Sequence, residues 1–343
     1  MDEIWVAGYP SFVGGADTEL DHNIDLWRMH NIDVNLVPMF GCDKKMKSLC
    51  DKRGCKTIEY SKDIFRDKVV VSFCNGEFLK KLPEIMEYGK PKRVIWFNCM
   101  TWLFDNEIIA INNNWIDFHG FVSEYQKNML LEQIQQKTDK NINILEGYKP
   151  YFNPNNLSQN LVFSYRKPSD YFCMGRVSRD DASKFSSDMW NIFYKVNSPL
   201  PTKTFILGFG ENAFKKCGQA PNGLDWQTWS PGAIPVKELY NKLHCLIHKT
   251  GGSRESYCRI VPECYAAGVP IIAENNYAFK ELVINEETGF LCESSDEMSY
   301  RASELAFDEK LRKKIIYNAY NYLMDCISNK KQCIRCWMNI FNQ

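Results

Sequence analysis

The sequence predicts an α/β fold with two doubly wound parallel sheets, one in each half of the chain. In each half, short apolar runs of strand length alternate with segments of helical periodicity. Between the halves, residues 146–160 are rich in Pro, Asn and Gly and lack apolar periodicity, which indicates a linker. The length of 343 residues suits two domains. Strands that alternate with helices favour parallel sheets covered on both faces.

The first half begins as a βαβ unit. Leu20, Ile24 and Trp27 recur at helical spacing between two short apolar strands. Ser123 and Gln126 have the spacing of a capping box, which predicts the start of a later helix. The predicted strands of this half lie at 4–8, 33–38, 68–73, 93–97 and 118–123.

The second half repeats the alternation of strands and helices. Its predicted strands lie at 170–175, 204–208, 245–248 and 269–274, and its helices at 186–196, 235–243, 262–268 and 296–325. We therefore expect an N-terminal domain over 1–155 and a C-terminal domain over 156–325. A last helix over 326–343 is expected to pack back on the N-terminal domain.

Composition limits the classes of partner and compartment. Lys plus Arg number 42, as do Asp plus Glu, so no global basic field indicates a nucleic-acid or membrane partner. There is no apolar run of the roughly 18 residues that a membrane span needs, and the first residues do not resemble a secretory leader. The 14 cysteines fit a reducing compartment. We expect a cytoplasmic protein.

No pattern in the sequence predicts a metal site. The five histidines show no ligand spacing, and no Asp-x-Asp motif is present. Cys326, Cys333 and Cys336 fall on one helical stripe, which favours buried packing over zinc binding.

Two glutamates, Glu255 and Glu263, lie eight residues apart in an apolar segment. Pro262 suits the first turn of a helix and Gly268 suits the position after its end, so Glu263 is predicted at a helix start, where the dipole favours a carboxylate. Glu255 precedes this helix in a loop that follows a predicted strand. Loops of this kind carry the ligand-binding residues of doubly wound sheets.

This pair and its flanks resemble the C-terminal motif of retaining GT-B glycosyltransferases of the GT4-like group. The resemblance extends over most of the chain, through the stretches 11–17, 118–126, 173–185 and 279–291. It implies a GT-B fold, in which two Rossmann-like domains face each other across a cleft. It also implies a hexosyl- or pentosyltransferase that acts with retention and without a metal. No cofactor is expected, and the implied co-substrate is a UDP- or GDP-linked sugar.

The resemblance also implies roles for particular residues. Arg176 and Lys184 match the pair that stabilises the leaving diphosphate, with Arg179 as a competitor for that place. Glu255 would hold the hydroxyls of the donor sugar, and Glu263 those of the ribose. Further donor-binding groups are expected in the two flanking loops, at Gly14, Gly15, Ser256, Tyr257 and Cys258.

The sequence departs from the family pattern at two places. Cys258 stands where many relatives carry Gly. The His that relatives often carry after a strand in the middle of the N-terminal domain is missing, and Asn98, Cys99 or Thr101 is expected to fill that space on the acceptor side. His119 is predicted to be a packed strand residue.

The acceptor stays open at this point. Residues 44–56 concentrate Lys and Arg, which suits a solvated helix, an anionic membrane with a glycolipid acceptor, or a nucleic acid with a modified base. A glycan acceptor is a further possibility. Alternative functions on the same scaffold are a nucleotide-sugar epimerase and an inactive nucleotide-sugar-binding module.

Overall fold

The computed structural model describes residues 2–12 and 14–342. The chain divides into two compact units. We call the first the N-unit (Met1–Ser158 with Ile327–Gln343) and the second the C-unit (Gln159–Cys326). The sequence-based boundaries at 155 and 325 lie close to these divisions. None of the helices in the described ranges is long and apolar enough to span a bilayer.

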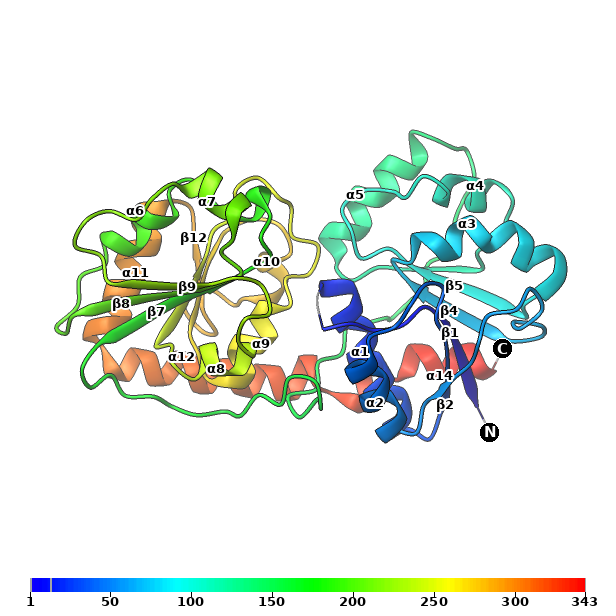
Figure 1. Cartoon of the computed structure of the whole chain (residues 1–343), viewed down its shortest axis with the longest axis horizontal. Helices are drawn as coiled ribbons and strands as arrows, with labels where there is room; N and C mark the ends of the chain where they lie inside the picture. The colour runs from blue at the N-terminus through cyan, green and yellow to red at the C-terminus, as the bar shows by residue number, and fades with distance from the viewer. Residues whose placement is uncertain (1, 13, 343) are drawn as a thin grey trace. The chain divides into compact units, whose positions relative to one another are not determined.

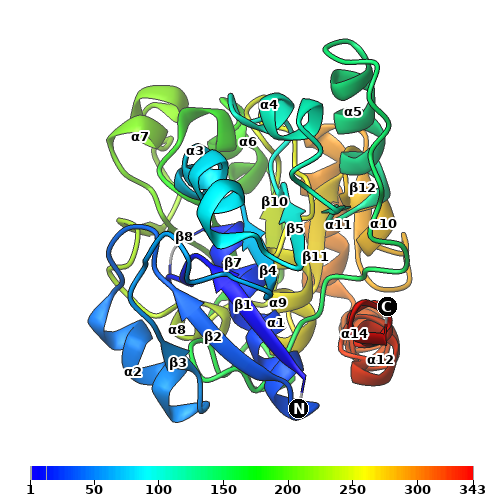
Figure 2. The same ribbon diagram turned by 90° about the vertical axis from the view of Figure 1, so that its right-hand side faces the viewer.

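The N-unit contains a parallel six-stranded sheet with the order β3-β2-β1-β4-β5-β6. Figure 2 shows β1, β4 and β5 side by side. The strands are β1 (Glu3–Ala7), β2 (Asp33–Val37), β3 (Lys56–Thr57), β4 (Val69–Phe73), β5 (Arg93–Phe97) and β6 (Phe118–Gly120). The helices are α1 (Gly15–Met29), α2 (Lys44–Lys52), α3 (Gly76–Glu84) with η1 (Ile85–Gly89), α4 (Glu107–Asn112), α5 (Glu124–Gln135), α13 (Lys330–Cys333) and α14 (Arg335–Asn342).

The C-unit contains a second parallel six-stranded sheet, with the order β12-β11-β10-β7-β8-β9. Figure 1 shows helices on both sides of its strands. The strands are β7 (Phe172–Val177), β8 (Thr202–Leu207), β9 (Trp226–Trp229), β10 (Cys245–His248), β11 (Ile271–Glu274) and β12 (Phe290–Cys292). The helices are η2 (Ala182–Lys184), α6 (Met189–Tyr194), α7 (Glu211–Cys217), α8 (Val236–Tyr240), α9 (Ile260–Ala267), α10 (Phe279–Leu282), α11 (Ser295–Phe307), α12 (Glu309–Tyr322) and η3 (Leu323–Ile327).

Both sheets reverse their strand order at one place, between β1 and β4 in the N-unit and between β7 and β10 in the C-unit. At such a switch point the following loops leave in opposite directions and open a crevice at the carboxyl ends of the strands. The predicted fold class of two doubly wound parallel sheets is therefore confirmed.

Local capping explains where several helices begin. The Ser123 side chain accepts from the Gln126 backbone N–H at 3.0 Å, as the capping-box spacing predicts. The helical patterns predicted over 296–325 form two main helices, α11 and α12, which are separated at Asp308. The Asp308 carboxylate accepts from the Leu311 N–H at 2.9 Å and starts α12 as a separate helix. Strand β9 escaped prediction because it is an edge strand with exposed residues.

The end of the chain completes the core of the N-unit. Trp337 of α14 is fully buried, and its ring meets Trp27 of α1 edge-on, with centroids 4.9 Å apart. Phe97 at the end of β5 and Tyr148 also lie against it, at 5.7 and 5.9 Å. A large aromatic side chain in this position contributes both area and edge-to-face geometry.

A buried ion network fixes the last residues of the N-unit before Gln159. Arg53 pairs with Asp21 and, at 3.1 Å, with Asp25, and all three side chains are buried. Asp25 accepts from Asn153 at 2.6 Å, and Asp21 accepts from Ser158 at 2.8 Å. Burial raises the pKa of Asp25, while Arg53 opposes this shift. Arg53 is thus one basic residue of the stretch 44–56 that is buried and does not contribute to an exposed basic surface.

Replacing Trp337 with Ala should destabilise the N-unit by about 3–5 kcal/mol, because it removes a fully buried ring and leaves a cavity. Chemical denaturation followed by fluorescence measures this loss. Trp102→Ala is the matched control, because the Trp102 side chain is exposed and its removal should cost less than about 1 kcal/mol. Equal losses in the two variants would contradict the core role of Trp337.

Candidate functional site

The candidate site of the C-unit lies at its switch point, where β7 and β10 are neighbours. The loop after β10 packs against the loop after β7 through two hydrogen bonds, from Gly251 N and Ser253 N to the Ser183 carbonyl, at 2.8 and 3.0 Å. A Cβ at position 251 would lie 1.9 Å from the Phe185 carbonyl oxygen, so only Gly allows this approach. The two loops therefore form one continuous surface.

An ion pair joins these loops. Lys184 Nζ lies 2.8 Å from Glu255 Oε1, and the side chains are only 17% and 11% exposed. Burial alone would raise the pKa of Glu255, but His248 and Lys184 outweigh it and lower this pKa to about 2. Glu255 is thus a carboxylate at neutral pH, and its position depends on the lysine of the opposite loop.

Arg176 lies beneath this pair, near the end of β7. It is 1% exposed, donates to the Lys184 carbonyl and stacks over the Phe185 ring at 5.0 Å. No carboxylate in the described residues lies within ion-pair distance of its guanidinium, and its Nε has no hydrogen-bond partner there. Burial lowers its pKa to about 10, although Glu255 acts in the opposite direction. Arg176 is therefore a buried cation without a bridging anion.

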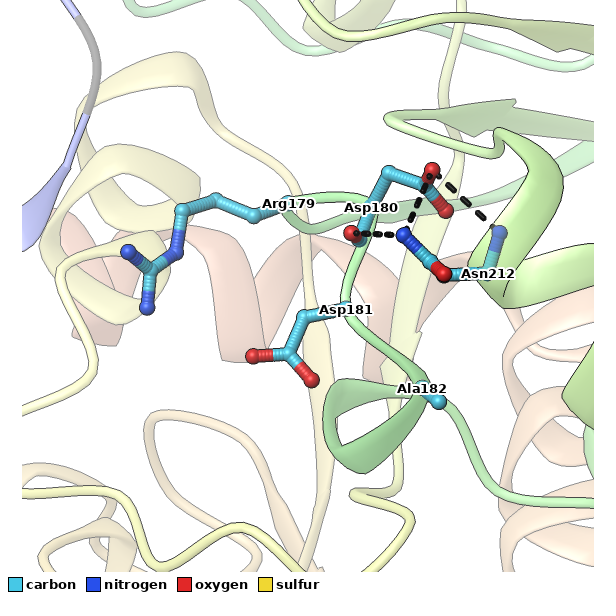
Figure 3. Close-up of a pocket in the computed structure, with 5 residues that line it drawn as sticks. All are labelled: Arg179, Asp180, Asp181, Ala182 and Asn212. Carbon is cyan, nitrogen blue, oxygen red and sulfur yellow. Dashed lines mark hydrogen bonds between the residues drawn. The ribbon is translucent and has the colours of Figure 1, made fainter.

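Arg179 lies farther along the same loop and lines a hollow of about 460 Å³ with Asp180, Asp181, Ala182 and Asn212. Figure 3 shows that Arg179 and Asp180 extend from the loop in opposite directions. The Asp180 carboxylate accepts from the Ala213 N–H at 2.8 Å, at the start of α7. The guanidinium of Arg179 is exposed, unlike that of Arg176.

Glu263 occupies the first turn of α9, as predicted, and Gly268 ends this helix in the left-handed conformation. Its Oε2 accepts from the Tyr240 hydroxyl at 2.8 Å and its Oε1 from Gln159 at 3.0 Å. Burial raises the pKa of Glu263. Neither partner was foreseen, since Tyr240 and Gln159 are far from Glu263 in sequence and belong to no motif. Each carboxylate oxygen accepts more than one hydrogen bond, so the ribose role of Glu263 stays a prediction.

Cys258 lies between the two glutamates and has a backbone φ of 58°. This is the left-handed region, which favours Gly and costs other residues about 1–2 kcal/mol. The side chain is buried, which raises the pKa of its thiol well above the usual value. The loop thus keeps the conformation that a glycine would adopt, in spite of the substitution.

His248 was missed as a site residue because it ends a strand and belongs to no ligand pattern. It is 3% exposed, and its Nε2 lies 3.7 Å from Glu255 Oε1. Burial and the charge of Arg176 lower its pKa to about 4, so the imidazole is neutral at pH 7.

The candidate residues of the N-unit lie at the carboxyl edge of its own sheet. Gly14, with a φ of 107°, precedes α1, and Gly15 is the first residue of this helix. The Gly14 carbonyl accepts from the Thr18 hydroxyl at 2.8 Å. The structure does not test the anion-binding role predicted for this loop.

The residues predicted to replace the family's His lie after β5. Asn98 is buried and donates to the Trp102 carbonyl and to Glu107 Oε2, both at 2.9 Å. The Cys99 N–H donates to the Cys74 sulfur at 2.8 Å. The Thr101 carbonyl accepts from Gln133 at 3.1 Å. The Asn98 amide therefore holds its own loop, and the acceptor-side roles of the three residues stay predictions.

His119 and the cysteines complete the survey of ligand-type side chains. His119 is buried in β6, and burial lowers its pKa to about 4. Cys333 and Cys336 are buried as predicted, but Cys326 is exposed, so the single buried stripe is wrong for that residue. Within 2–12 and 14–342, no group of His, Cys, Asp and Glu is arranged to hold a metal ion. The independence from metal stays a prediction.

The segment that carries His248, Glu255 and Glu263 matches a known family. The sequence profile described as "Glycosyl transferases group 1" matches residues 201–322. This segment of the C-unit is thus similar to a group 1 glycosyltransferase domain. Arg176 and Lys184 precede the matched segment, and Lys184 contacts it through the ion pair with Glu255. A search of curated proteins finds no match to the chain.

Solved structures share the fold of the whole chain. HepE from Anabaena, solved with UDP and glucose, has 14% identity and a TM-score of 0.73, with 100% of both chains covered. A TarM mutant from S. aureus, solved with fondaparinux, alpha-GlcNAc-glycerol and UDP, has 10% identity and a TM-score of 0.74, with 100% of both chains covered. A glycosyltransferase from Rickettsia africae has 14% identity and a TM-score of 0.69 over 99% of this chain and 98% of its own. The two sheets are thus those of a GT-B fold, and the domain match with this fold supports a glycosyltransferase.

Cys258→Gly should be more stable than Cys258→Ala by about 1 kcal/mol, because both variants lose the thiol but only Gly relieves the left-handed backbone. Urea denaturation of the two variants measures the difference. Cys264→Gly and Cys264→Ala provide the control pair, since Cys264 lies inside α9, where Gly should be the less stable residue. The strain assignment fails if Ala is the more stable residue at both positions.

Proposed function

We propose that the chain transfers a sugar from a nucleotide-sugar to an acceptor, with the diphosphate bound at the switch point of the C-unit. The observation that carries this proposal is Arg176, a buried guanidinium with no carboxylate within ion-pair distance among the described residues. A buried charge without a counter-charge is costly, and a bound diphosphate would supply that counter-charge. Lys184, which is part of the same surface, adds a second cation.

The proposed transfer is metal-independent and proceeds with retention, as in the GT4-like group. Arg176 and Lys184 stabilise the charge that develops on the leaving diphosphate, and this diphosphate takes the proton of the acceptor hydroxyl. Glu255 orients the donor sugar through its second oxygen, Oε2. Rate then arises mainly from charged groups held in place before the reaction, rather than from a protein nucleophile.

We further propose that the donor nucleotide is UDP, since HepE and TarM were both solved with UDP. The hollow of about 460 Å³ that Arg179 lines offers room for part of the donor. The proposed setting is the cytoplasm, where nucleotide-sugars are available as substrates.

A thermal-shift panel of UDP-, GDP-, ADP- and TDP-sugars tests the donor. A UDP-sugar at about 100 times its Kd should add roughly 2.7 kcal/mol of stability. Glu255→Ala should abolish donor hydrolysis and transfer while the protein stays folded. Glu287→Ala is the control, because Glu287 is an exposed acid of the same unit. The proposal fails if no nucleotide-sugar stabilises the protein. If the wild type binds a nucleotide-sugar but does not hydrolyse it, the chain would be an inactive binding module. Inversion of the sugar at C2 would instead indicate an epimerase.

For the acceptor, we propose a molecule presented at an anionic lipid surface. Lys44, Lys45 and Lys47 of α2 are exposed and form no ion pair within the described residues. The same is true of Lys52 and Lys56. Phe40, which precedes α2, is 68% exposed. Lysines beside an exposed aromatic ring suit a charged interface with an apolar interior better than a nucleic-acid backbone.

Reversing the charge of Lys44, Lys45 and Lys47 to Glu should abolish sedimentation with vesicles that contain anionic lipid. The loss has an electrostatic cause, at about 1 kcal/mol per lysine near the surface. Lys80, Lys90 and Lys92, which are exposed elsewhere in the N-unit, give the control triple variant. Retention on DNA with no vesicle binding would instead favour a modified base as acceptor.

A further inference from the structure

His248 is a buried polar side chain that lies beside Glu255 without forming a hydrogen bond to it. Neither ring nitrogen has a hydrogen-bond partner among the described residues, although the side chain is 3% exposed. The distance of 3.7 Å from Nε2 to Glu255 Oε1 exceeds that of a hydrogen bond. Phe279 flanks the ring, with centroids 5.4 Å apart. Unpaired buried polar groups are rare because they forfeit their hydration.

Under the proposed function, the Lys184 ammonium interacts with two anions, Glu255 and the leaving diphosphate. It donates to Glu255 Oε1 at 2.8 Å, and under the proposed function the leaving diphosphate requires the same ammonium. When the lysine turns to the diphosphate, the Glu255 carboxylate loses its partner in a site where its side chain is only 11% exposed. An unpaired carboxylate at this depth is strongly unfavourable.

Several other donors near this cluster already have acceptors, although Arg176 Nε has none among the described residues. Arg176 donates to the Lys184 carbonyl, and the Tyr240 hydroxyl donates to Glu263. The Thr250 N–H donates to Glu274 at 2.9 Å. The imidazole of His248 faces the same Glu255 oxygen that Lys184 holds.

We propose that His248 is a positioning residue that takes over Glu255 Oε1 when a diphosphate draws Lys184 away. The exchange needs the tautomer with a proton on Nε2 and an approach of about 0.8 Å, from 3.7 Å to the usual 2.9 Å. Glu255 then keeps one partner on Oε1 throughout the reaction, and Oε2 stays directed to the sugar. This inference rests on the proposed function.

The test measures binding of UDP, the probe, to the full chain by calorimetry. His248→Leu should weaken UDP binding about tenfold, because the lysine then leaves a buried carboxylate unpaired. His248→Gln, which places an amide N–H near the Nε2 position, should bind within about threefold of wild type. The kcat of donor hydrolysis should likewise fall in His248→Leu and stay near the wild-type value in His248→Gln. The KM for the donor should change less than kcat, because the full charge of the diphosphate develops only when the bond to the sugar breaks.

A double-mutant cycle separates this role from a structural one. In a Glu255→Gln background, His248→Leu should have no further effect on UDP binding, because the neutral amide needs no replacement partner. The inference is overturned if His248→Leu binds UDP as wild type does, or if its loss persists in that background. Absence of UDP binding by the wild type would instead remove the proposed function, and the inference with it.

A spectroscopic measurement keeps the inference testable if His248→Leu does not fold. UDP should move the side-chain ¹⁵N resonance of His248 Nε2 toward that of a hydrogen-bonded donor in the wild-type protein. The same titration of Glu255→Gln should leave this resonance nearly unchanged. A resonance that ignores UDP in wild type contradicts the proposed exchange.

Discussion

The ion pair between Lys184 and Glu255 is the interaction on which the candidate site depends. It ties the loop after β7 to the loop after β10, and these strands are neighbours only because the strand order reverses between them. The close approach at Gly251 brings the two loops together, and the pair then fixes the carboxylate. Arg176 lies under the same contact, so cation and anion are held within one rigid surface before any ligand arrives.

Electrostatics in this site follows from burial. The same low exposure that raises the pKa of Glu263 acts on Glu255, yet Glu255 remains ionised because His248 and Lys184 counter it. Two carboxylates eight residues apart thus have opposite pKa shifts. His248 and Lys184 lower the pKa of Glu255, whereas burial raises that of Glu263 although its hydrogen bonds from Tyr240 and Gln159 act in the opposite direction. Their environments, rather than their spacing, distinguish their roles.

Sequence reasoning reached the two sheets and the loops that carry Arg176, Lys184 and Glu255, because strand periodicity and helix signals are local. Contacts between residues that are far apart in the sequence have no comparable local pattern. Tyr240, Gln159 and His248 meet the glutamates only after the strands are ordered. The burial of Arg53 was not predictable, since a cluster of basic residues in sequence does not reveal which of them faces two buried aspartates.

The last helix has a consequence for synthesis of the chain on the ribosome. The C-unit is continuous in sequence, from Gln159 to Cys326, whereas the N-unit is closed by residues from Ile327 onward. Trp337 enters the space between Trp27, Phe97 and Tyr148 only after every residue of the C-unit has left the ribosome. The core of the N-unit is therefore completed only after the C-unit has been synthesised, although most of the N-unit is made first.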